Sequence, residues 1–389
     1  MDKLWVDILR GKNAVGENLI EVSDGTSSLL LEYGTQLTPT AEGKEMEDAV
    51  RIKEYDAVFI THSHADHCGL LKRGTKARRI YMGESTYKIL SYCNGIKESL
   101  RNKIVYLENE KTVRIGKIKV TPYICDHSAY DSYMLLIEKD GERILYTGDF
   151  RANGRKSFSY LLKRLPKKVD VLITEGTNLG WQGECITERD LEERVVKLCK
   201  EKKKIFVLQS TLNIDRTVTM YRASKRTGKK FIQKLASAEV CGVLNNIPEP
   251  IKFNECYTYL QRGVNVERHK KIIDKYGKKL LSKNNIAKLD SFMMQVSSDS
   301  SSYLQSLAGL CNLRESVLIY SMWGGYKQNM QEFLSDIKAL GIEIIDLHTS
   351  GHADVGTIEI LKQRVNPSRI YFVHCEKEKS IQEKEKTYL

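Results

Sequence analysis

Histidine is concentrated in a few short segments of this 389-residue chain. Seven of its eight histidines fall in four segments, and the richest segment, 61–69, reads Thr-His-Ser-His-Ala-Asp-His-Cys-Gly. A neutral imidazole offers one nitrogen lone pair, so several imidazoles in a small volume are typical of metal binding. A mixed set of histidine and aspartate is typical of catalytic zinc, which keeps an open position for water. The segment therefore predicts hydrolytic metal chemistry.

The spacing within this segment predicts two neighbouring metal positions. The apolar run from Tyr55 to Ile60 is typical of a buried strand. If the chain stays extended beyond it, His62 and His64 point the same way and can hold one ion. Asp66 and His67 come after the chain turns toward a helix. They therefore point in a different direction, and we expect them to hold a second ion.

Residues of ligand type also follow other predicted strands. These candidates are Asp126 and His127 after 118–123, Asp149 after 143–146, His348 and His352 near the C-terminus, and His374 after 370–373. Taken alone, each is compatible with an ordinary polar turn. For Asp126, His127, Asp149 and His374, the position at a strand exit favours one site assembled from distant parts of the chain.

In their order along the chain, these residues resemble the five-motif ligand set of the metallo-β-lactamase fold. The matching positions are His62, His64, Asp66, His67, His127 and Asp149. Glu175, His352 and His374 resemble motifs A, B and C of its beta-CASP branch, a group of nucleases. The chain is similar to RNase J of that branch without the additional C-terminal domain of the bacterial enzyme. One departure is Glu32, which stands where the family usually has an aspartate that supports the site from behind.

The resemblance implies two zinc ions, although the ligand types allow manganese as well. It assigns His62, His64 and His127 to one ion, Asp66, His67 and His374 to the other, and Asp149 to both. A two-metal-activated hydroxide would hydrolyse RNA phosphodiesters and leave 5′-phosphate and 3′-hydroxyl ends. The implied catalytic residues are Asp66, the general acid His352, and Glu175, which would orient and charge His352.

Substrate contacts are expected from a second group of polar residues. The predicted substrate-binding residues are Ser210, Arg216, His348, Ser350 and Gly351. Ser210 and Arg216 resemble a Ser-x-x-x-Arg element of the family, with a longer gap between them. For His348, a buried structural histidine is as compatible with the sequence as a phosphate contact.

The order of predicted strands favours two sheets packed face to face with helices outside. The resemblance implies an αββα sandwich with an inserted α/β lid, the beta-CASP domain. We place the first part of the sandwich at 1–180, the insert at 181–312 and the return segment with motifs B and C at 313–389. The strand within 316–321 is expected to re-enter the sandwich.

Charge and composition restrict the partners and the compartment. Residues 181–312 contain 24 Lys and Arg against 14 Asp and Glu, a net charge of +10 out of the chain's +12. This concentration of positive charge favours a polyanionic partner, here single-stranded RNA.

Nine cysteines without a Cys-x-x-Cys pair indicate the cytoplasm. No apolar run approaches the roughly 20 residues needed to span a bilayer. A homodimer is compatible with the sequence, and 376–386 is expected to be a charged helix.

Several functions remain open at this point. RNA is favoured because members of the family with a histidine at motif C, here His374, generally act on RNA. A DNA nuclease of the same family is the first alternative. A small-molecule metallo-hydrolase is the second alternative, against which the basic insert argues. A catalytically silent binding subunit ranks last because every ligand position is occupied. The sequence leaves endonuclease and 5′-to-3′ exonuclease activity undecided.

Overall fold

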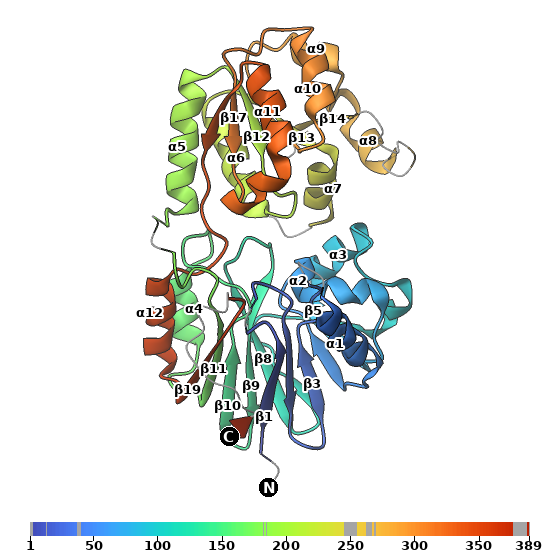
Figure 1. The fold of residues 1–389 in the computed structure, drawn as a ribbon, viewed down its shortest axis with the longest axis vertical. Helices are drawn as coiled ribbons and strands as arrows, with labels where there is room; N and C mark the ends of the chain where they lie inside the picture. Colours follow the sequence, from blue (N-terminus) through green and yellow to red (C-terminus); the bar gives the residue numbers. More distant parts are fainter. Residues whose placement is uncertain are drawn as a thin grey trace. The chain divides into compact units, whose positions relative to one another are not determined.

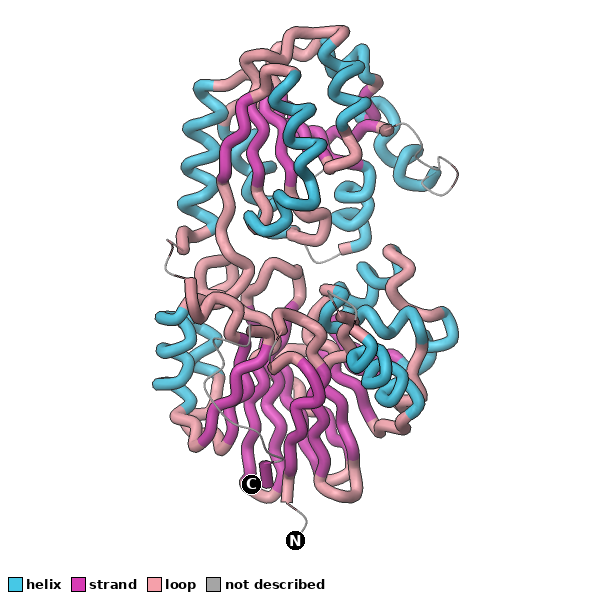
Figure 2. The backbone as a smooth tube through the Cα atoms, in the orientation of Figure 1, coloured by secondary structure: helices cyan, strands magenta, loops and turns pink. Residues whose placement is uncertain are grey.

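The computed structural model describes residues 3–388 except 13, 37–39, 182, 184, 245–254, 262–266, 268, 269 and 376–386. The chain forms two compact units (Figures 1 and 2). The first unit combines Met1–Glu184 with Gly351–Leu389, and the second consists of Cys185–Ser350. The expected helix at 376–386 lies outside the described residues.

The first unit contains two sheets. In spatial order, one consists of β20 (Thr387–Tyr388), β1 (Trp5–Arg10), β2 (Leu19–Ser23), β3 (Ser28–Leu31), β4 (Ala57–Phe59), β5 (Arg79–Gly83) and β6 (Ile104–Leu107). The other consists of β19 (Arg369–Val373), β11 (Val171–Glu175), β10 (Glu142–Tyr146), β9 (Ser132–Lys139), β8 (Ile118–Cys125) and β7 (Val113–Ile115). β10, β11 and β19 pair in parallel, while β9 is antiparallel to both β8 and β10. Consequently β8, β10, β11 and β19 all end at the same edge of this sheet.

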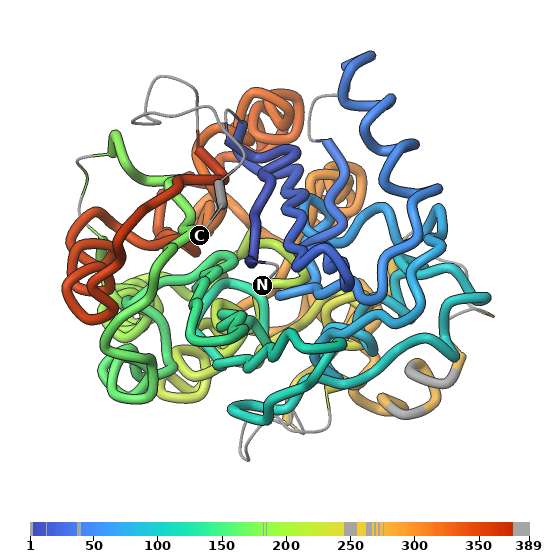
Figure 3. Tube along the Cα trace, turned by 90° about the horizontal axis from the view of Figure 1, so that it is seen from below, coloured from blue at the N-terminus to red at the C-terminus, as the bar shows by residue number. Residues whose placement is uncertain are grey.

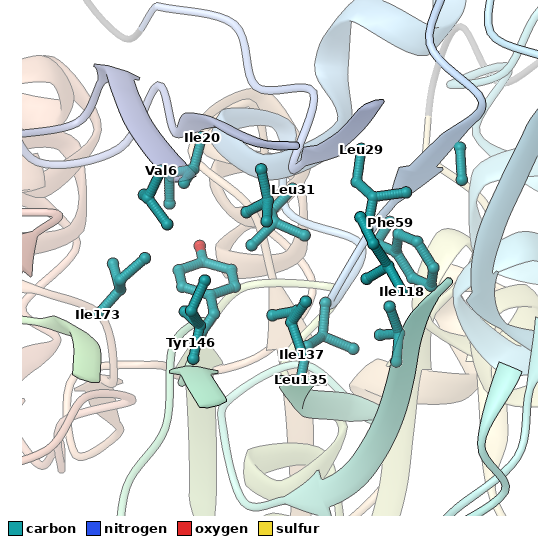
Figure 4. Close-up of a cluster of buried hydrophobic side chains, with 14 of the residues drawn as sticks. Val6, Ile20, Leu29, Leu31, Phe59, Ile118, Leu135, Ile137, Tyr146 and Ile173 are labelled. Carbon is teal, nitrogen blue, oxygen red and sulfur yellow. The ribbon is translucent and has the colours of Figure 1, made fainter. Parts of the chain in front are cut away.

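Alternating apolar residues hold the two sheets face to face. In β3, Leu29 and Leu31 belong to the cluster between the sheets, whereas Leu30 packs on the outer face. This follows from the strand geometry, in which successive side chains point to opposite faces. Figure 4 shows Phe59 of one sheet and Tyr146 of the other within the same buried cluster.

Helices cover the outer faces of the two sheets on opposite sides of the unit (Figure 3). On the β4 side these are α1 (Ala41–Ile52), η1 (Gly69–Arg73), α3 (Glu84–Tyr92) and η2 (Glu98–Lys103), and the short α2 (Ala65–Cys68) precedes η1. On the β10 side they are α4 (Phe158–Arg164) and α12 (Val355–Val365). The predicted αββα sandwich is confirmed.

The second unit is built on one parallel sheet. In spatial order its strands are β15 (Leu280–Leu281), β14 (Tyr257–Tyr259), β13 (Lys230–Lys234), β16 (Phe292–Val296), β12 (Lys204–Leu208), β17 (Val317–Tyr320) and β18 (Glu343–Asp346). Its described helices are α5 (Glu188–Glu201), α6 (Ile214–Arg226), α7 (Leu235–Val243), α8 (Lys270–Tyr276), η3 (Gly277–Lys279), α9 (Lys283–Ala287), α10 (Ser301–Ala308), η4 (Gly324–Met330) and α11 (Gln331–Ala339). The continuous apolar runs of the central strands suit burial on both faces.

The return to the sandwich occurs later than the sequence suggested. β17 pairs in parallel with β12, and β18 pairs in parallel with β17, so both belong to the second unit. The unit boundaries are therefore at Cys185 and Gly351, in place of the expected 181 and 313. The apolar run of β17 suits the interior of either sheet, and its neighbour β12 is far away in sequence. The strand pattern alone therefore could not identify its sheet.

Among the helices that the structure describes, none is long and apolar enough to cross a membrane.

Candidate metal centre

His62 and His64 follow β4 and their rings meet, as the alternation along an extended segment predicts. Nε2 of His62 lies 3.1 Å from Nδ1 of His64, and Nε2 of His127 lies 3.2 Å from the same nitrogen. Oδ2 of Asp149 lies 3.8 Å from Nε2 of both His62 and His127. These four side chains make one group whose ligand atoms all lie within 4.8 Å of one another.

Asp66, His67 and His374 form a neighbouring group of the same kind. Nε2 of His374 lies 3.0 Å from Oδ2 of Asp66, and Nε2 of His67 lies 3.8 Å from that oxygen. Oδ2 of Asp149 is 3.2 Å from Nε2 of His67 and 3.6 Å from Nε2 of His374. Asp149 therefore stands between the two groups. The family resemblance assigned it this position, and its role as a ligand stays a prediction.

Strand ends position these side chains. His127, Asp149, Glu175 and His374 all follow or complete strands that end at one edge of the second sheet. Asp149 follows Gly148, whose φ is +54°. A Cβ at that glycine would lie 2.9 Å from Oγ1 of Thr61. The loop carrying Asp149 can therefore lie against the His62 loop only with glycine at this position.

The charge states favour a cation in the first group. Burial lowers the pKa of His62 and His127 well below the ordinary histidine value, and it lowers the pKa of His64 to about 4. These imidazoles are therefore neutral at pH 7, the form that offers a lone pair to a metal.

The carboxylates are ionised despite their burial. Burial opposes the charge of Asp149, but the nearby His374 and His67 hold its pKa well below the ordinary aspartate value. The pKa of Asp66 is likewise lowered, by His67 and by the hydrogen bond from His374, against the effect of burial. Oδ1 of Asp149 is buried and has no hydrogen-bond partner among the described residues. A buried carboxylate oxygen of this kind is costly unless it is paired or coordinates a metal, so these residues fit metal ions.

His352 stands beside this centre in a different environment. Its Nδ1 lies 3.0 Å from Oε2 of Glu175 and 3.7 Å from Oδ2 of Asp149. Burial opposes protonation, but these two carboxylates raise the pKa of His352 to about 9. Its side chain keeps 22% of its surface exposed, whereas the side chain of Glu175 keeps 1%. His352 is therefore a protonated group with access to solvent.

Glu175 connects three loops of the centre. Its Oε1 accepts hydrogen bonds from the backbone N–H of Phe150, at 2.9 Å, and of Ala353, at 3.3 Å. Its Oε2 holds His352. The α12 helix begins two residues after Ala353, where the side chain of Asp354 accepts from the N–H of Thr357. The backbone of the His352 segment is therefore fixed from both sides.

Glu32 supports the centre from behind, as its place in the sequence suggested. Its Oε1 lies 3.3 Å from Nδ1 of His67 and accepts from the hydroxyl groups of Thr61, at 2.5 Å, and Tyr146, at 3.2 Å. All four side chains are buried. The longer carboxylate thus reaches His67 and leaves the ring oriented toward Asp149.

Two supporting features were not predicted. Oγ1 of Thr177 lies 2.7 Å from Nδ1 of His374 and 3.2 Å from Nδ1 of His352. Asp126 and Arg151 form a buried ion pair with an Nε to Oδ1 distance of 2.5 Å, and this pair joins the loops of His127 and Asp149. Asp126 was a ligand-type candidate in the sequence, and the structure places it in this pair with Arg151, outside the ligand groups of the described residues. Thr177 and Arg151 each lie within two residues of a predicted site residue.

The predicted substrate-binding residues are in varied environments. Arg216 is fully buried, and its guanidinium lies 3.1 Å from the carboxylate of Glu188 and 3.3 Å from Nδ1 of His348. Ser210 is exposed, and Ser350 follows β18 in the second unit. The carbonyl of Gly351 in the first unit accepts a hydrogen bond from Nδ1 of His127 at 2.5 Å. Their contacts with substrate stay predictions.

Arg216 is expected to act on stability. Arg216→Met should lower the free energy of unfolding by about 3–5 kcal/mol, because it leaves the buried Glu188 charge without its partner. Arg222→Met is the matched control, since that side chain is 52% exposed in its pair with Glu192 and should cost about 1 kcal/mol or less. Urea unfolding followed by circular dichroism measures both variants. Unchanged stability with weakened RNA binding would instead support the substrate-binding role.

The fold and this centre together define a metallohydrolase-like protein, and comparison with known proteins agrees. Residues 36–245 match the family model of the beta-lactamase superfamily domain. The chain therefore belongs to the beta-lactamase superfamily, in the metallo-β-lactamase branch with the beta-CASP nucleases, as its motifs suggested.

Similar proteins include the cleavage and polyadenylation specificity factor 73 of Drosophila melanogaster, 29% identical over 45% of this chain and 29% of that protein. The probable RNase MJ4 of Methanocaldococcus jannaschii is 28% identical over 42% of this chain and 43% of that protein. Ribonuclease J of Corynebacterium glutamicum is 23% identical over 62% of this chain and 37% of that protein. This chain thus spans less than half the length of these relatives.

A solved structure of a protein of unknown function from Enterococcus faecalis matches the whole of both chains, with a TM-score of 0.82 and 18% identity. At this identity the likeness concerns the fold alone.

Proposed function

We propose that the protein is a metal-dependent ribonuclease that hydrolyses RNA phosphodiesters and leaves 5′-phosphate and 3′-hydroxyl ends. The observation that carries the proposal is the pair of ligand groups with Asp149 between them, and His352, held by Glu175, beside them. A two-metal site with an adjacent proton donor suits in-line displacement at phosphorus. Relatives named as ribonucleases support RNA as the substrate.

The chain's own residues supply the binding of two zinc ions. His62, His64 and His127 would hold one ion, Asp66, His67 and His374 the other, and Asp149 both. When bound, the ions would lower the pKa of water and neutralise charge on the phosphate oxygens. Thr177 keeps the ring of His374 in place by a hydrogen bond with its Nδ1, and the Glu32 carboxylate lies 3.3 Å from Nδ1 of His67.

His352 would protonate the departing 3′ oxygen. Its Nδ1–H is held by Glu175 at 3.0 Å, which leaves Nε2–H as the proton donor. The Glu175 carboxylate favours the imidazolium form, so the acid is charged at neutral pH. Glu175 therefore positions and charges His352 without touching the substrate.

The second unit would bind single-stranded RNA. Residues 185–350 contain 27 Lys and Arg against 18 Asp and Glu, a net charge of +9. Such a surface attracts a polyanion, whereas a small substrate does not require it. The nine cysteines are all free thiols, which is consistent with a reducing compartment such as the cytoplasm.

The function is tested with zinc-loaded protein and matched 5′-labelled RNA and single-stranded DNA of one sequence. We expect the RNA to be cleaved and the DNA to be cleaved much more slowly, with new 5′-phosphate ends that a phosphatase removes. Parallel assays with manganese determine the preferred metal, and product sizes distinguish internal cutting from removal of 5′ nucleotides. Faster cleavage of DNA, or no cleavage of either polymer, would contradict the proposal.

A further inference from the structure

A concave pocket of about 360 Å³ lies in the second unit. Its lining residues do not include any of the predicted metal ligands. Its lining comes from the last turns of α6, the following loop, the first residues of β13 and β14, and η3. The lining residues are Tyr221, Lys225, Gly228, Lys229, Lys230, Phe231, Glu255, Tyr257 and Lys279. The described lining therefore contains four lysines and one carboxylate, a net charge of +3.

The pocket is at the amino ends of parallel strands. β13 begins at Lys230, β14 begins at Tyr257, and β15 begins directly after Lys279. The connection back to the first unit, in contrast, follows the carboxyl end of β18. A five-residue strand is about 17 Å long, so the pocket and this connection belong to opposite edges of one sheet.

Internal contacts hold the lysines in the pocket. Nζ of Lys230 lies 4.9 Å from the centre of the Tyr257 ring and 3.3 Å from its hydroxyl. The side chain of Lys229 is buried and donates to the carbonyl of Lys203 at 3.0 Å. Lys225 pairs with Glu255. The charges are therefore organised before any ligand arrives.

Three other basic side chains of this unit are neutralised by acidic neighbours. Lys202 pairs with Glu343 at 3.0 Å, and Lys203 pairs with Asp290 at 3.0 Å. Arg226 contacts both Glu192 and Glu193. The carbonyls that end α6 do not counter the lysine charge strongly, because those of Ser224 and Lys225 accept N–H groups of the following turn. The pocket therefore keeps a net positive charge, whereas the charge of these three side chains is neutralised.

We propose that this pocket is a second RNA-binding site, which receives backbone phosphates of the substrate strand outside the metal centre. Its volume suits about one nucleotide unit, and lysine ammonium groups bind phosphate as compact point charges. This inference depends on the proposed function, because it assigns the polyanion to the RNA strand. Contacts of this kind position the strand and do not touch the reacting phosphorus.

The test compares two triple variants in the full chain. Lys225, Lys230 and Lys279 are each changed to Gln in one variant, and the exposed Lys197, Lys200 and Lys288 in the control. Binding of a 30-nucleotide single-stranded RNA is followed by fluorescence anisotropy in chelator, which prevents cleavage, over a salt series. The pocket variant should bind RNA roughly tenfold more weakly. The slope of its log affinity against log salt concentration should be smaller in magnitude by up to about 2. The control should change less in both respects.

Two further measurements separate the pocket from general charge. Glu255→Gln should tighten RNA binding, because it removes the one carboxylate among the described lining residues. Lysine acetylation read by mass spectrometry should show RNA protecting Lys225, Lys230 and Lys279 but not Lys197 or Lys200, and this result does not depend on a variant folding. With metal restored, the pocket variant should have a raised KM and an unchanged kcat.

The outcomes distinguish the two proposals. Equal losses in the pocket and control variants, or acetylation without protection, would overturn the second site and leave the ribonuclease assignment intact. Protection of the pocket lysines by AMP or pyrophosphate but not by RNA would also overturn the second site and leave the ribonuclease assignment intact. The occupant would then be a free phosphate compound. A protein that binds RNA through the pocket but cleaves neither polymer would overturn the proposed function alone.

Discussion

Asp149→Ala is expected to lose both bound metal and hydrolytic activity. Oδ2 of Asp149 lies within 3.8 Å of a ligand nitrogen of His62, His127, His67 and His374, so its removal weakens both ligand groups at once. Elemental analysis should find about two transition-metal ions in the wild-type chain and fewer in the variant. Because metal catalysis contributes several kcal/mol, activity should fall roughly 1,000-fold or more.

Two controls make this prediction specific. Asp149→Asn keeps the size of the side chain and removes its charge, so it should lose metal even if Asp149→Ala folds poorly. Asp140→Asn changes a carboxylate that is 60% exposed on a turn, and it should keep both metal and activity. Wild-type protein that remains fully active in excess chelator would refute the metal-dependent function itself.

His352→Ala should behave differently from a ligand variant. Metal content should remain unchanged, while turnover falls about 100-fold to 10,000-fold, the usual effect of removing a positioned general acid. A substrate with a 3′ thiolate leaving group needs little protonation on departure. It should recover much of the loss in His352→Ala and little of the loss in Asp149→Ala. Elemental analysis and single-turnover rates on the two substrates measure these effects.

The pH dependence provides an independent measure of His352. Its pKa is raised from the ordinary 6.5 to about 9, so the ring stays protonated through neutral pH and loses its proton as the pH rises through about 9. Wild-type turnover should therefore decrease above that pH, and His352→Ala should lack this decrease. Glu175→Gln removes the main favourable charge beside the ring, so the decrease should move to lower pH.

Loss of metal from His352→Ala would identify His352 as a ligand. Such a role is geometrically conceivable, since Asp149, Glu175, His352 and His374 also form a group with ligand atoms within 4.8 Å of one another. If the thio substrate rescues neither variant, the proton donor must be a different residue. His348 would be examined next.

Local spacing along the chain predicted the first residues of the candidate centre, and the family resemblance supplied the others. His62 and His64 share a face because they are two residues apart in an extended segment, and Asp66 and His67 diverge because a helix begins at Ala65. Residues placed directly after apolar runs, such as Asp149 after β10, meet wherever those strands end together. The sandwich was expected from the order of the strands and from the family resemblance, and the structure then places Leu29 and Leu31 of β3 between the sheets and Leu30 on the outer face.

The supporting contacts required the tertiary structure. Thr177 approaches His374, and Arg151 pairs with Asp126, across many residues of chain. Threonine, arginine and aspartate are common surface residues, so their types carry no signal by themselves. The resemblance to a Ser-x-x-x-Arg element of the family suggested Arg216 as a substrate-binding residue, whereas the fold buries it against Glu188.

The boundary between the units was also decided by tertiary structure. The apolar run of β17 was recognisable as a strand, but the sequence placed it in the sandwich, and it pairs with β12 and β18 in the second unit. A strand buried on both faces carries the same apolar pattern in any parallel sheet. Its hydrogen-bond partner depends on which distant strand edge it meets during folding. By itself, the sequence therefore determined the candidate ligands and the sandwich, and only the three-dimensional pairing determined where the inserted unit ends.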